Sequence, residues 1–417
     1  MRNGPDVRSA ERVGADFRAT RALFLIAAAA VSATLIYLVA TSAGGALTFS
    51  LIVGMAFAGV AGWLVARPPE LVRSRRLPGV LAMLSALAFF VAVPELCLRA
   101  AGFRFESGVI EFAPFPAAFA RYAPDAVLLW RWDPQYRLNS YGYPADEPRV
   151  PKPRDVFRIL HLGDSCSYAE IGPSPPPNYP ALADAMLAPI VSRIGQRVDT
   201  VNLALPGYSS HQGRMLANRY GQRLQPDLVV VYFGWNDHWP AFGAVDADKK
   251  VAVTTGQLAR ASARVTQEVR LVQALAWFLA RVRGPQVPID ALRVSIDAYT
   301  TNLEWIGDHF TRLGAIPLFI TAPTSHYRLG VPQGLVRANF GPDGKTILAR
   351  HREYNERVRA LTKRHGWHLL DLEREMDGAD RIDRLFVNDG IHFSTAGKAY
   401  VASELSRYVA GHILHAQ

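Results

Sequence analysis

Two short stretches of the sequence carry residues that can form a nucleophile and its base. The first, Leu162 to Ser167, reads Leu-Gly-Asp-Ser-Cys-Ser at the end of a β-rich run, and Gly163 is a small residue at which the backbone can bend sharply. A serine hydroxyl becomes a good nucleophile only when a neighbouring base removes its proton. The pattern therefore predicts that Ser165 is exposed at a strand-to-helix turn and requires a histidine from elsewhere in the chain.

A suitable histidine lies near the end of the chain. Asp389 precedes His392 by three residues, on a polar segment before the last expected helix. At this spacing the carboxylate can turn back and bind Nδ1 of the imidazole, which fixes the tautomer and leaves Nε2 free to accept the serine proton. We therefore expect Ser165, His392 and Asp389 to act together as nucleophile, base and acid.

Acyl transfer also needs hydrogen-bond donors for the oxygen that becomes negative in the transition state. Two further strand ends supply them: a Pro-Gly-Tyr turn around Gly207, and the sequence Gly-Trp-Asn-Asp from Gly234 to Asp237. We assign the oxyanion hole to the backbone N–H groups of Ser165 and Gly207 and to the side-chain amide of Asn236.

Neighbouring residues are expected to support the site rather than to react. Asp164 is expected to bind backbone N–H groups and so to hold the nucleophile turn. Gly234 and Asp237 flank the amide donor, and Asp237 is expected to shape the pocket wall, with a second catalytic pair of Asp237 and His238 as the alternative. Standard phosphate and metal signatures do not occur in the sequence, so neither a cofactor nor a metal is expected.

The order of elements around these motifs predicts a parallel α/β fold. The expected strands cover residues 157–162, 198–203, 228–233, 316–321 and 368–372. The expected helices cover residues 179–194, 212–224, 257–282, 291–313, 346–365 and 394–413. This alternation predicts a three-layer α/β/α sandwich with a mainly parallel five-stranded sheet of the flavodoxin-like type. Ligands bind at the carboxyl ends of such strands, where the motifs above lie.

Four blocks in this order, Gly-Asp-Ser, a glycine block, Gly-x-Asn-Asp and Asp-x-x-His, resemble the SGNH (GDSL-like) hydrolase superfamily. The resemblance extends over about residues 158 to 408. The four family letters fall on Ser165, Gly207, Asn236 and His392, and the triad acid falls on Asp389. The resemblance implies a serine esterase or an O-acetyltransferase.

Residues 1–98 contain three almost wholly apolar windows, 22–41, 47–66 and 77–98, each near the ~20 residues that a helix needs to cross a bilayer. We therefore expect three transmembrane helices that anchor the chain in the bilayer. Arginines precede the first window and separate the second from the third, which predicts a cytoplasmic amino terminus. Everything after Arg99 is then expected outside the cytoplasm, in the periplasm of a Gram-negative cell, with the anchor in the inner membrane.

These expectations divide the chain into a membrane anchor (1–98), a connector (99–155) and an SGNH hydrolase-like domain (156–417). The net charge is +10, but residues 1–100 hold ten arginines against five acids, and the remaining charge forms no basic run. We therefore expect no nucleic-acid partner. The apolar positions within 257–283 follow helical spacing and are expected to pack on the sheet or as a lid, with a membrane-surface helix as the alternative.

The group that accepts the acyl moiety decides the function. Water as acceptor makes an esterase, and we expect first an ester hydrolase that acts outside the cytoplasm on an esterified carbohydrate or lipid. A sugar hydroxyl as acceptor makes an O-acetyltransferase of an envelope polysaccharide, which would need a membrane partner to deliver the acyl donor. The third alternative is a non-catalytic binding or scaffolding module.

Overall fold

The computed structural model of the chain describes residues 91, 94–95, 97–106, 109–112, 121–172, 175–253, 265–266, 268–283, 290–338 and 340–414. Contacts within the chain define two compact units. The smaller unit comprises residues 1–105 and 257–284, and the larger comprises residues 106–256 and 285–417. The predicted boundaries after residues 98 and 155 stay a prediction.

A parallel five-stranded sheet forms the centre of the larger unit. Its strands are β4 (Val156–Gly163), β5 (Arg197–Asn202), β6 (Leu228–Tyr232), β8 (Ile316–Ile320) and β9 (His368–Leu370). They lie in the order β5-β4-β6-β8-β9, and every neighbouring pair is parallel. This is the flavodoxin-like order, in which the chain changes direction across the sheet after its first two strands. The expected α/β fold with a parallel sheet is confirmed.

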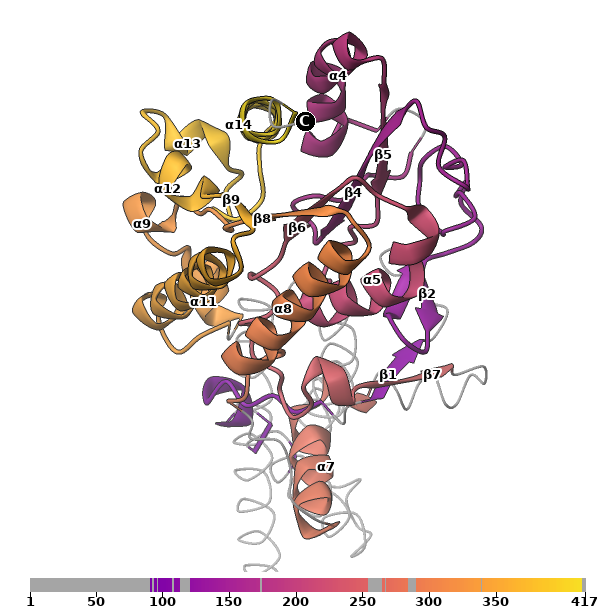
Figure 1. The fold of residues 1–417 in the computed structure, drawn as a ribbon. Coiled ribbons are helices and arrows are strands. Elements are labelled where there is room, and N and C mark those ends of the chain that lie inside the picture. Colours follow the sequence, from indigo (N-terminus) through magenta and orange to yellow (C-terminus); the bar gives the residue numbers. More distant parts are fainter. Residues whose placement is uncertain are drawn as a thin grey trace, which may run out of the picture. The chain divides into compact units, whose positions relative to one another are not determined.

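Helices cover both faces of this sheet (Figure 1). One layer consists of α4 (Tyr179–Val191) and α14 (Thr395–His412), which pack against each other. The opposite layer consists of α5 (Ser210–Leu224), α8 (Ile296–Arg312) and α11 (Gly344–His365). The three expected layers are therefore present.

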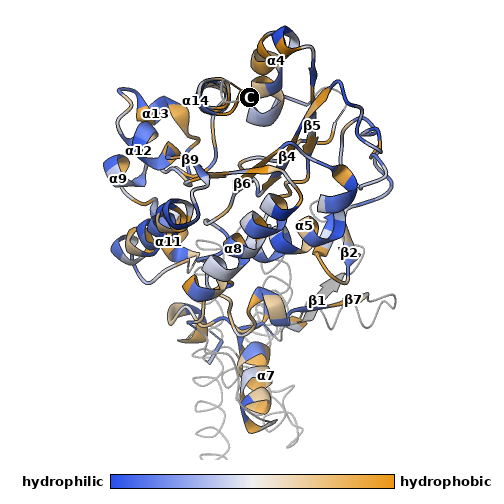
Figure 2. Ribbon diagram, viewed as in Figure 1, coloured by the Kyte–Doolittle hydropathy of each residue, from blue (hydrophilic) through white to orange (hydrophobic). Residues whose placement is uncertain are grey.

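Successive side chains of each strand point to opposite faces of the sheet, and this alternation divides the hydrophobic core into two parts. On β4, Phe157 and Ile159 belong to the core beneath α4 and α14, whereas Leu160 and Leu162 belong to the core beneath α5, α8 and α11. All eight residues of β4 are buried, because helices cover the strand on both faces. Figure 2 shows that the central strands are largely hydrophobic, whereas the helices around them carry both hydrophobic and hydrophilic residues.

Two small sheets lie outside the central one. Strand β1 (Val109–Phe112) pairs in parallel with β7 (Lys250–Val253), and β2 (Tyr122–Asp125) pairs antiparallel with β3 (Leu129–Trp132). The turn of the β2–β3 hairpin is closed by Asp125, whose Oδ1 accepts the N–H groups of residues 127 and 128 at 2.9 and 2.8 Å. The predicted connector thus contains strands that the sequence pattern did not indicate.

Short helices occupy the remaining connections. They are η2 (Ser192–Ile194), η3 (Asp246–Asp248), α9 (His326–Leu329), α10 (Gln333–Arg337), α12 (Leu372–Asp377) and α13 (Ile382–Leu385). The long helices begin at residues that satisfy their free N–H groups. Asn178, Asp343 and Ser394 accept the N–H of Ala181, Thr346 and Gly397 in α4, α11 and α14.

In the smaller unit, Glu95 stabilises the start of helix α7 (Arg270–Arg283). The two carboxyl oxygens of Glu95 accept the backbone N–H groups of Arg270 and Leu271 at 3.0 and 2.8 Å. A negative charge is favourable there because the first N–H groups of a helix have no partner within it. Arg99 pairs with Glu95 at 2.7 Å and also donates to the carbonyl oxygen of Glu268 at 2.6 Å.

The prediction of three transmembrane helices ahead of the α/β fold is corrected by the structure. No helix in the described part of the chain is long and apolar enough to cross a membrane. The windows 22–41 and 47–66 and most of 77–98 lie outside the described residues. Where the third window is described, its one charged residue, Glu95, binds protein N–H groups. The orientation, the bilayer anchoring and the location derived from these windows stay predictions.

Of the expected helix at 257–282, the structure describes residues 265–266 and 268–282, and α7 begins at Arg270. Its apolar positions Leu275, Phe278 and Val282 are exposed. Phe103 packs edge-on against Trp277, with ring centroids 6.3 Å apart. The lid and the membrane-surface helix both stay predictions.

Substitution of two glycines in α14 tests how tightly this helix docks. A Cβ at Gly397 would lie 1.9 Å from the carbonyl oxygen of Leu385, whereas a Cβ at Gly411 would meet nothing within 4 Å. We expect Gly397→Ala to reduce the free energy of unfolding by about 1–3 kcal/mol through overpacking. Gly411→Ala should raise it by up to about 1 kcal/mol, because alanine favours the helix. Denaturant unfolding followed by circular dichroism measures both, and equal effects of the two changes would contradict the packing described here.

Candidate active site

Ser165 lies in the turn that follows β4, at the carboxyl edge of the sheet. The turn is closed by Asp164, whose Oδ1 accepts the N–H of Cys166 at 2.9 Å. The carbonyl oxygen of Asp164 accepts the N–H groups of Ser167 and Tyr168, each at 3.1 Å. Asp164 therefore holds the turn as the sequence predicted, and it is buried.

The structure brings the three predicted triad residues together. Oγ of Ser165 lies 2.7 Å from Nε2 of His392, and Nδ1 of His392 lies 2.6 Å from Oδ2 of Asp389. With Nδ1–H donated to the carboxylate, Nε2 is the acceptor for the serine proton. The side chains of His392 and Asp389 are 42% and 35% exposed, so the reacting groups are accessible from solvent.

The carboxylate of Asp389 is held by the loop that it belongs to. Its Oδ1 accepts the backbone N–H groups of Ile391 and His392 at 2.8 and 2.9 Å, which leaves Oδ2 for the imidazole. Burial opposes ionisation, but the hydrogen bonds from the His392 side chain and from the two N–H groups outweigh it and lower the pKa of Asp389 to about 2. Asp389 is therefore an anion throughout the physiological range.

This anion acts in turn on His392. The hydrogen bond to Asp389 raises the pKa of the His392 imidazole, and burial opposes the rise. The charge of Asp164 adds to the rise in the pKa of His392. Asp164 itself has a pKa raised to about 6, mainly because its side chain is buried. Both carboxylates thus favour the imidazolium that forms when the serine proton is taken.

The predicted oxyanion donors lie on neighbouring loops. Gly207 has a φ of +83°, a conformation that favours glycine, and its added Cβ would lie 3.0 Å from the Trp130 ring. Nε1–H of Trp130, on the β2–β3 hairpin, donates to the carbonyl oxygen of Pro206 at 3.1 Å. Among the described residues, no hydrogen bond involves the N–H of Ser165 or of Gly207, so both donors are available to a substrate oxygen.

The amide of Asn236 is fixed between two of these groups. Its Nδ2 donates to the carbonyl oxygen of Tyr208 at 3.0 Å and lies 3.4 Å from Oδ2 of Asp164. The longer contact is weak, so the N–H that faces Asp164 can bind a substrate oxygen instead at little cost. Asn236 thus connects the loop after β6 with the nucleophile turn and with the loop after β5, residues 203–209, which is the oxyanion loop.

The remaining predicted residues have structural contacts. A Cβ on Gly163 would lie 2.7 Å from Oγ of Ser167, so the turn needs a residue without a side chain there. Gly234 directly follows β6 and Phe233 and begins the loop that carries Asn236. Asp237 is buried and accepts the N–H of Ser210 at 2.9 Å, at the start of α5. Burial raises the pKa of Asp237 to about 7.

An ion pair that the sequence analysis missed holds the oxyanion loop. Nη2 of Arg293 donates to the carbonyl oxygen of Gly207 at 2.8 Å and to Oδ2 of Asp246 at 2.7 Å. The same carboxylate oxygen accepts Oγ–H of Ser209 at 2.8 Å. Asp246 is fully buried, yet the attraction of Arg293 and Lys249 outweighs desolvation and lowers its pKa. Arg293 lies 86 residues after Gly207 in the chain, and no local pattern marks the pair.

Within the described ranges, no group of three or more His, Cys, Asp or Glu side chains is arranged to hold a metal ion. The two cysteines, Cys97 and Cys166, are both free. Burial raises the pKa of the Cys166 thiol, so the residue next to the serine is a protonated, packed side chain.

The sequence matches one protein-family model, and the match includes the turn, the oxyanion loops and the histidine described above. It is the model of the GDSL-like lipase/acylhydrolase family, and it covers residues 161–400, more than half of the chain. The chain belongs to the GDSL-like lipase/acylhydrolase family. It therefore has the fold and the ester-hydrolysing class of site that the sequence resemblance implied. No protein of curated function matches the chain.

The solved structures that the chain is similar to are distant in sequence. A lipase/acylhydrolase from Enterococcus faecalis is 18% identical, with a TM-score of 0.38, and the match covers 61% of this chain and 95% of that one. A putative GDSL-like lipase from Parabacteroides merdae is 13% identical, with a TM-score of 0.40, and the match covers 62% of this chain and 98% of that one. An acetylxylan esterase from Geobacillus stearothermophilus is 14% identical, with a TM-score of 0.37, and the match covers 61% of this chain and 94% of that one. Similarities this remote transfer no substrate to this GDSL-like chain.

Replacing the Asp389 carboxylate tests its contact with the imidazole. In Asp389→Asn the amide oxygen can still accept the two loop N–H groups, so the loop should keep its shape. The amide nitrogen would face Nδ1 and favour the wrong tautomer of His392, and we expect kcat for an activated ester to fall by up to ~10⁴-fold. Steady-state kinetics and circular dichroism measure the two effects. Near-normal kcat in a folded variant would show that another group orients His392.

The pH profile tests the second carboxylate. The base must be neutral to accept a proton, so kcat/KM should fall as the pH decreases through the pKa of His392. Asp164→Asn removes a charge that raises the pKa of His392, so this acidic limb should move to lower pH. The plateau rate should fall by less than about tenfold, because an asparagine oxygen can still accept the Cys166 N–H. A limb that stays in place or moves to higher pH would contradict this coupling.

Proposed function

We propose that the protein hydrolyses acyl esters by a serine mechanism, with Ser165 as nucleophile, His392 as base and Asp389 as the acid that orients it. The observation that carries this proposal is the continuous chain of contacts from Ser165 Oγ to His392 Nε2 at 2.7 Å and from His392 Nδ1 to Asp389 at 2.6 Å. An activated serine beside hydrogen-bond donors is the arrangement that acyl transfer requires.

The first half of the proposed reaction forms an acyl enzyme. Nε2 of His392 takes the proton from Ser165 as Oγ attacks the ester carbonyl carbon, and the π-electron pair moves to the carbonyl oxygen. The N–H groups of Ser165 and Gly207 and the amide of Asn236 bind this oxyanion. When the intermediate collapses, the ester C–O bond breaks, and the alcohol leaves with the proton from Nε2.

The second half returns the enzyme to its starting state. A water molecule gives its proton to Nε2 of His392 and attacks the acyl carbon, and the same donors bind the second oxyanion. The bond to Ser165 then breaks, Oγ recovers the proton, and the carboxylic acid is released. The negative charge of Asp389 stabilises the imidazolium in both halves.

For the substrate, we propose an ester-bearing carbohydrate or lipid. The partial exposure of His392 and Asp389 supports this choice, because a site near the surface admits an ester on a large molecule. The acyl enzyme could equally pass its acyl group to a sugar hydroxyl, which would make the protein an O-acetyltransferase with a membrane partner as donor. Hydrolysis ranks first because this chain and water supply every group that it needs.

Active-site labelling tests the mechanism. A fluorophosphonate should label the purified full chain at Ser165, as mapped on the modified peptide by mass spectrometry, and Ser165→Ala should lose both the label and the turnover of 4-nitrophenyl acetate. Ser192→Ala is the matched control, because Ser192 is exposed and donates its hydroxyl only to the Pro189 carbonyl oxygen. It should keep the label and the activity.

The outcomes separate the alternatives. If the folded chain neither reacts with the probe nor turns over the ester, it is a non-catalytic binding module. If label and turnover are present, the products of an acetylated oligosaccharide decide between the two reactions. Free acetate indicates hydrolysis, whereas acetate transferred to a second oligosaccharide indicates the transferase.

A further inference from the structure

The loop that carries Asp389 and His392 lies against the segment that follows β8. Three hydrogen bonds connect them: Oγ1–H of Thr324 and the N–H of Ser325 donate to the carbonyl oxygen of Gly390 at 2.9 and 3.1 Å, and Nε2–H of His326 donates to the carbonyl oxygen of Asp389 at 2.6 Å. His326 is buried and contributes the shortest of the three.

Gly390 shows how closely the segment after β8 approaches the loop that carries Asp389 and His392. Its φ is +71°, and an added Cβ would lie 2.4 Å from Cδ2 and 2.5 Å from Nε2 of His326 and 2.7 Å from Oγ of Ser325. The imidazole of His326 therefore occupies the space that a side chain at residue 390 would need. The turn between Asp389 and His392 is shaped around this ring.

The hydrogen bond to the Asp389 carbonyl oxygen also determines which ring nitrogen of His326 carries a hydrogen. A carbonyl oxygen only accepts, so Nε2 carries the hydrogen. Burial lowers the pKa of His326, and the contact with Asp389 opposes the change. The neutral ring thus acts as a fixed donor. Its Nδ1 is buried and has no partner among the described residues, so one of its two nitrogens serves no structural contact.

Helix α11 anchors the segment from its other side. Asn355 accepts the N–H of Ala322 and donates to its carbonyl oxygen, both at 2.9 Å, and Nε2 of His351 donates to the same oxygen at 2.7 Å. Trp235, from the loop of Asn236, stacks on His351 with ring centroids 3.8 Å apart and an interplanar angle of 18°. Burial lowers the pKa of His351 to about 3, so this contact is also neutral.

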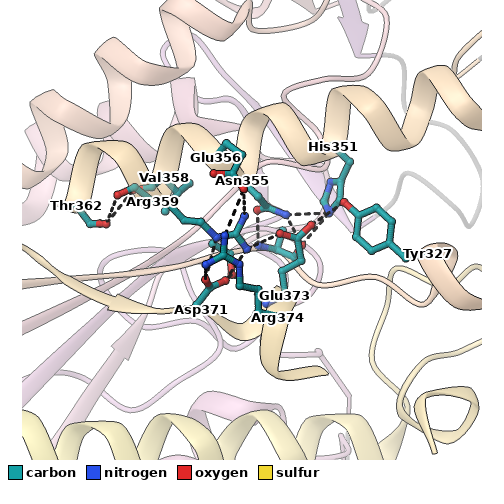
Figure 3. Close-up of polar contacts among 12 residues, drawn as sticks. Tyr327, His351, Asn355, Glu356, Val358, Arg359, Thr362, Asp371, Glu373 and Arg374 are labelled. Carbon is teal, nitrogen blue, oxygen red and sulfur yellow. Dashed lines mark hydrogen bonds and ion pairs between the residues drawn. The ribbon is translucent and has the colours of Figure 1, made fainter. Parts of the chain in front are cut away.

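An ion-pair network continues from α11 to the residue next to His326, as Figure 3 shows. Tyr327 donates its hydroxyl to Glu373 at 2.6 Å, and Glu373 pairs with Arg359 at 2.6 Å. Arg359 also binds Asp371 at 2.6 Å, directly after β9. The segment 322–327 is thus fixed at both ends before His326 reaches the Asp389 carbonyl.

We infer that His326 is a positioning residue, which sets the triad loop by holding the Asp389 carbonyl and filling the space beside Gly390. Its task is separate from that of the Asp389 carboxylate. Both carboxyl oxygens of Asp389 are already bound within the loop, by the N–H groups of Ile391 and His392 and by the imidazole. Among the described residues, the Asp389 carbonyl oxygen is the group of this residue that accepts a hydrogen bond from outside the loop, so it is through this oxygen that His326 can orient Asp389. Its effect on rate rests on the proposed serine mechanism, because a small displacement of the base matters only if Ser165 reacts.

Two matched substitutions test the inference in the full chain. His326→Gln keeps an amide N–H near the position of Nε2, whereas His326→Asn places it near Nδ1, too far from the Asp389 carbonyl. With 4-nitrophenyl acetate we expect His326→Asn to lower kcat by ~10–100-fold with KM within about twofold, since small misplacements of reacting groups cost up to ~10²-fold. His326→Gln should stay within about threefold of the native kcat. If His326 only filled space in the core, glutamine would not restore kcat.

A spectroscopic readout keeps this test independent of turnover. The proton between Nδ1 of His392 and Asp389 should give a low-field NMR resonance, assigned by its loss in His392→Gln. We expect the resonance to persist in His326→Gln and to broaden or shift upfield in His326→Asn. If the native chain shows the resonance but no turnover, the proposed function fails while the positioning role is still decided. Unchanged kcat and resonance in His326→Asn, or equal losses in both variants, would overturn the inference.

Discussion

Ser165, Gly207 and Asn236 follow three different strands, and the parallel pairing of the sheet is what brings them together. In a parallel sheet all strands end at the same edge, so every loop that follows a strand reaches the same region of space. The nucleophile turn follows β4, the oxyanion loop follows β5, the Asn236 loop follows β6, and the segment of His326 follows β8. The triad loop alone comes from a connection between helices, and it therefore needs support from the others.

The polar groups around the site divide by charge. Where a charge is buried, as at Asp246, it is paired at once with Arg293 and a hydroxyl, because an unpaired ion in the interior is costly. Where a buried group has no ion of opposite charge beside it, the group is neutral. Burial lowers the pKa of both His238 and His351, and Nε2 of His238 lies 3.2 Å from Nδ1 of His351 as an uncharged donor and acceptor. The triad is different, because Asp389 stays ionised while half exposed.

How much could be predicted from the sequence follows from the range of the interactions. The five central strands and the residues at their ends were predicted, because hydrophobic runs and short motifs are local patterns. The contacts of Arg293 with Gly207 and of His326 with Asp389 were not, since they join residues 86 and 63 positions apart without any local signal. The β2–β3 hairpin was missed because strands of four residues give too little periodicity. The transmembrane prediction relied on the length of three apolar windows and on the arginines around them, and no spanning helix is found in the described residues, where Glu95 binds the start of α7.

The packing of Trp130 against Gly207 has a consequence for how the domain can be isolated. The family region begins at residue 161, within β4, yet the ring that supports the oxyanion loop comes from residue 130. A fragment trimmed to the family boundaries would lack residues 156–160 of β4, and the Pro206 carbonyl oxygen would lose the indole N–H that binds it. The smallest piece of this protein that can be expressed with an intact site therefore extends at least from the β2–β3 hairpin to the end of α14.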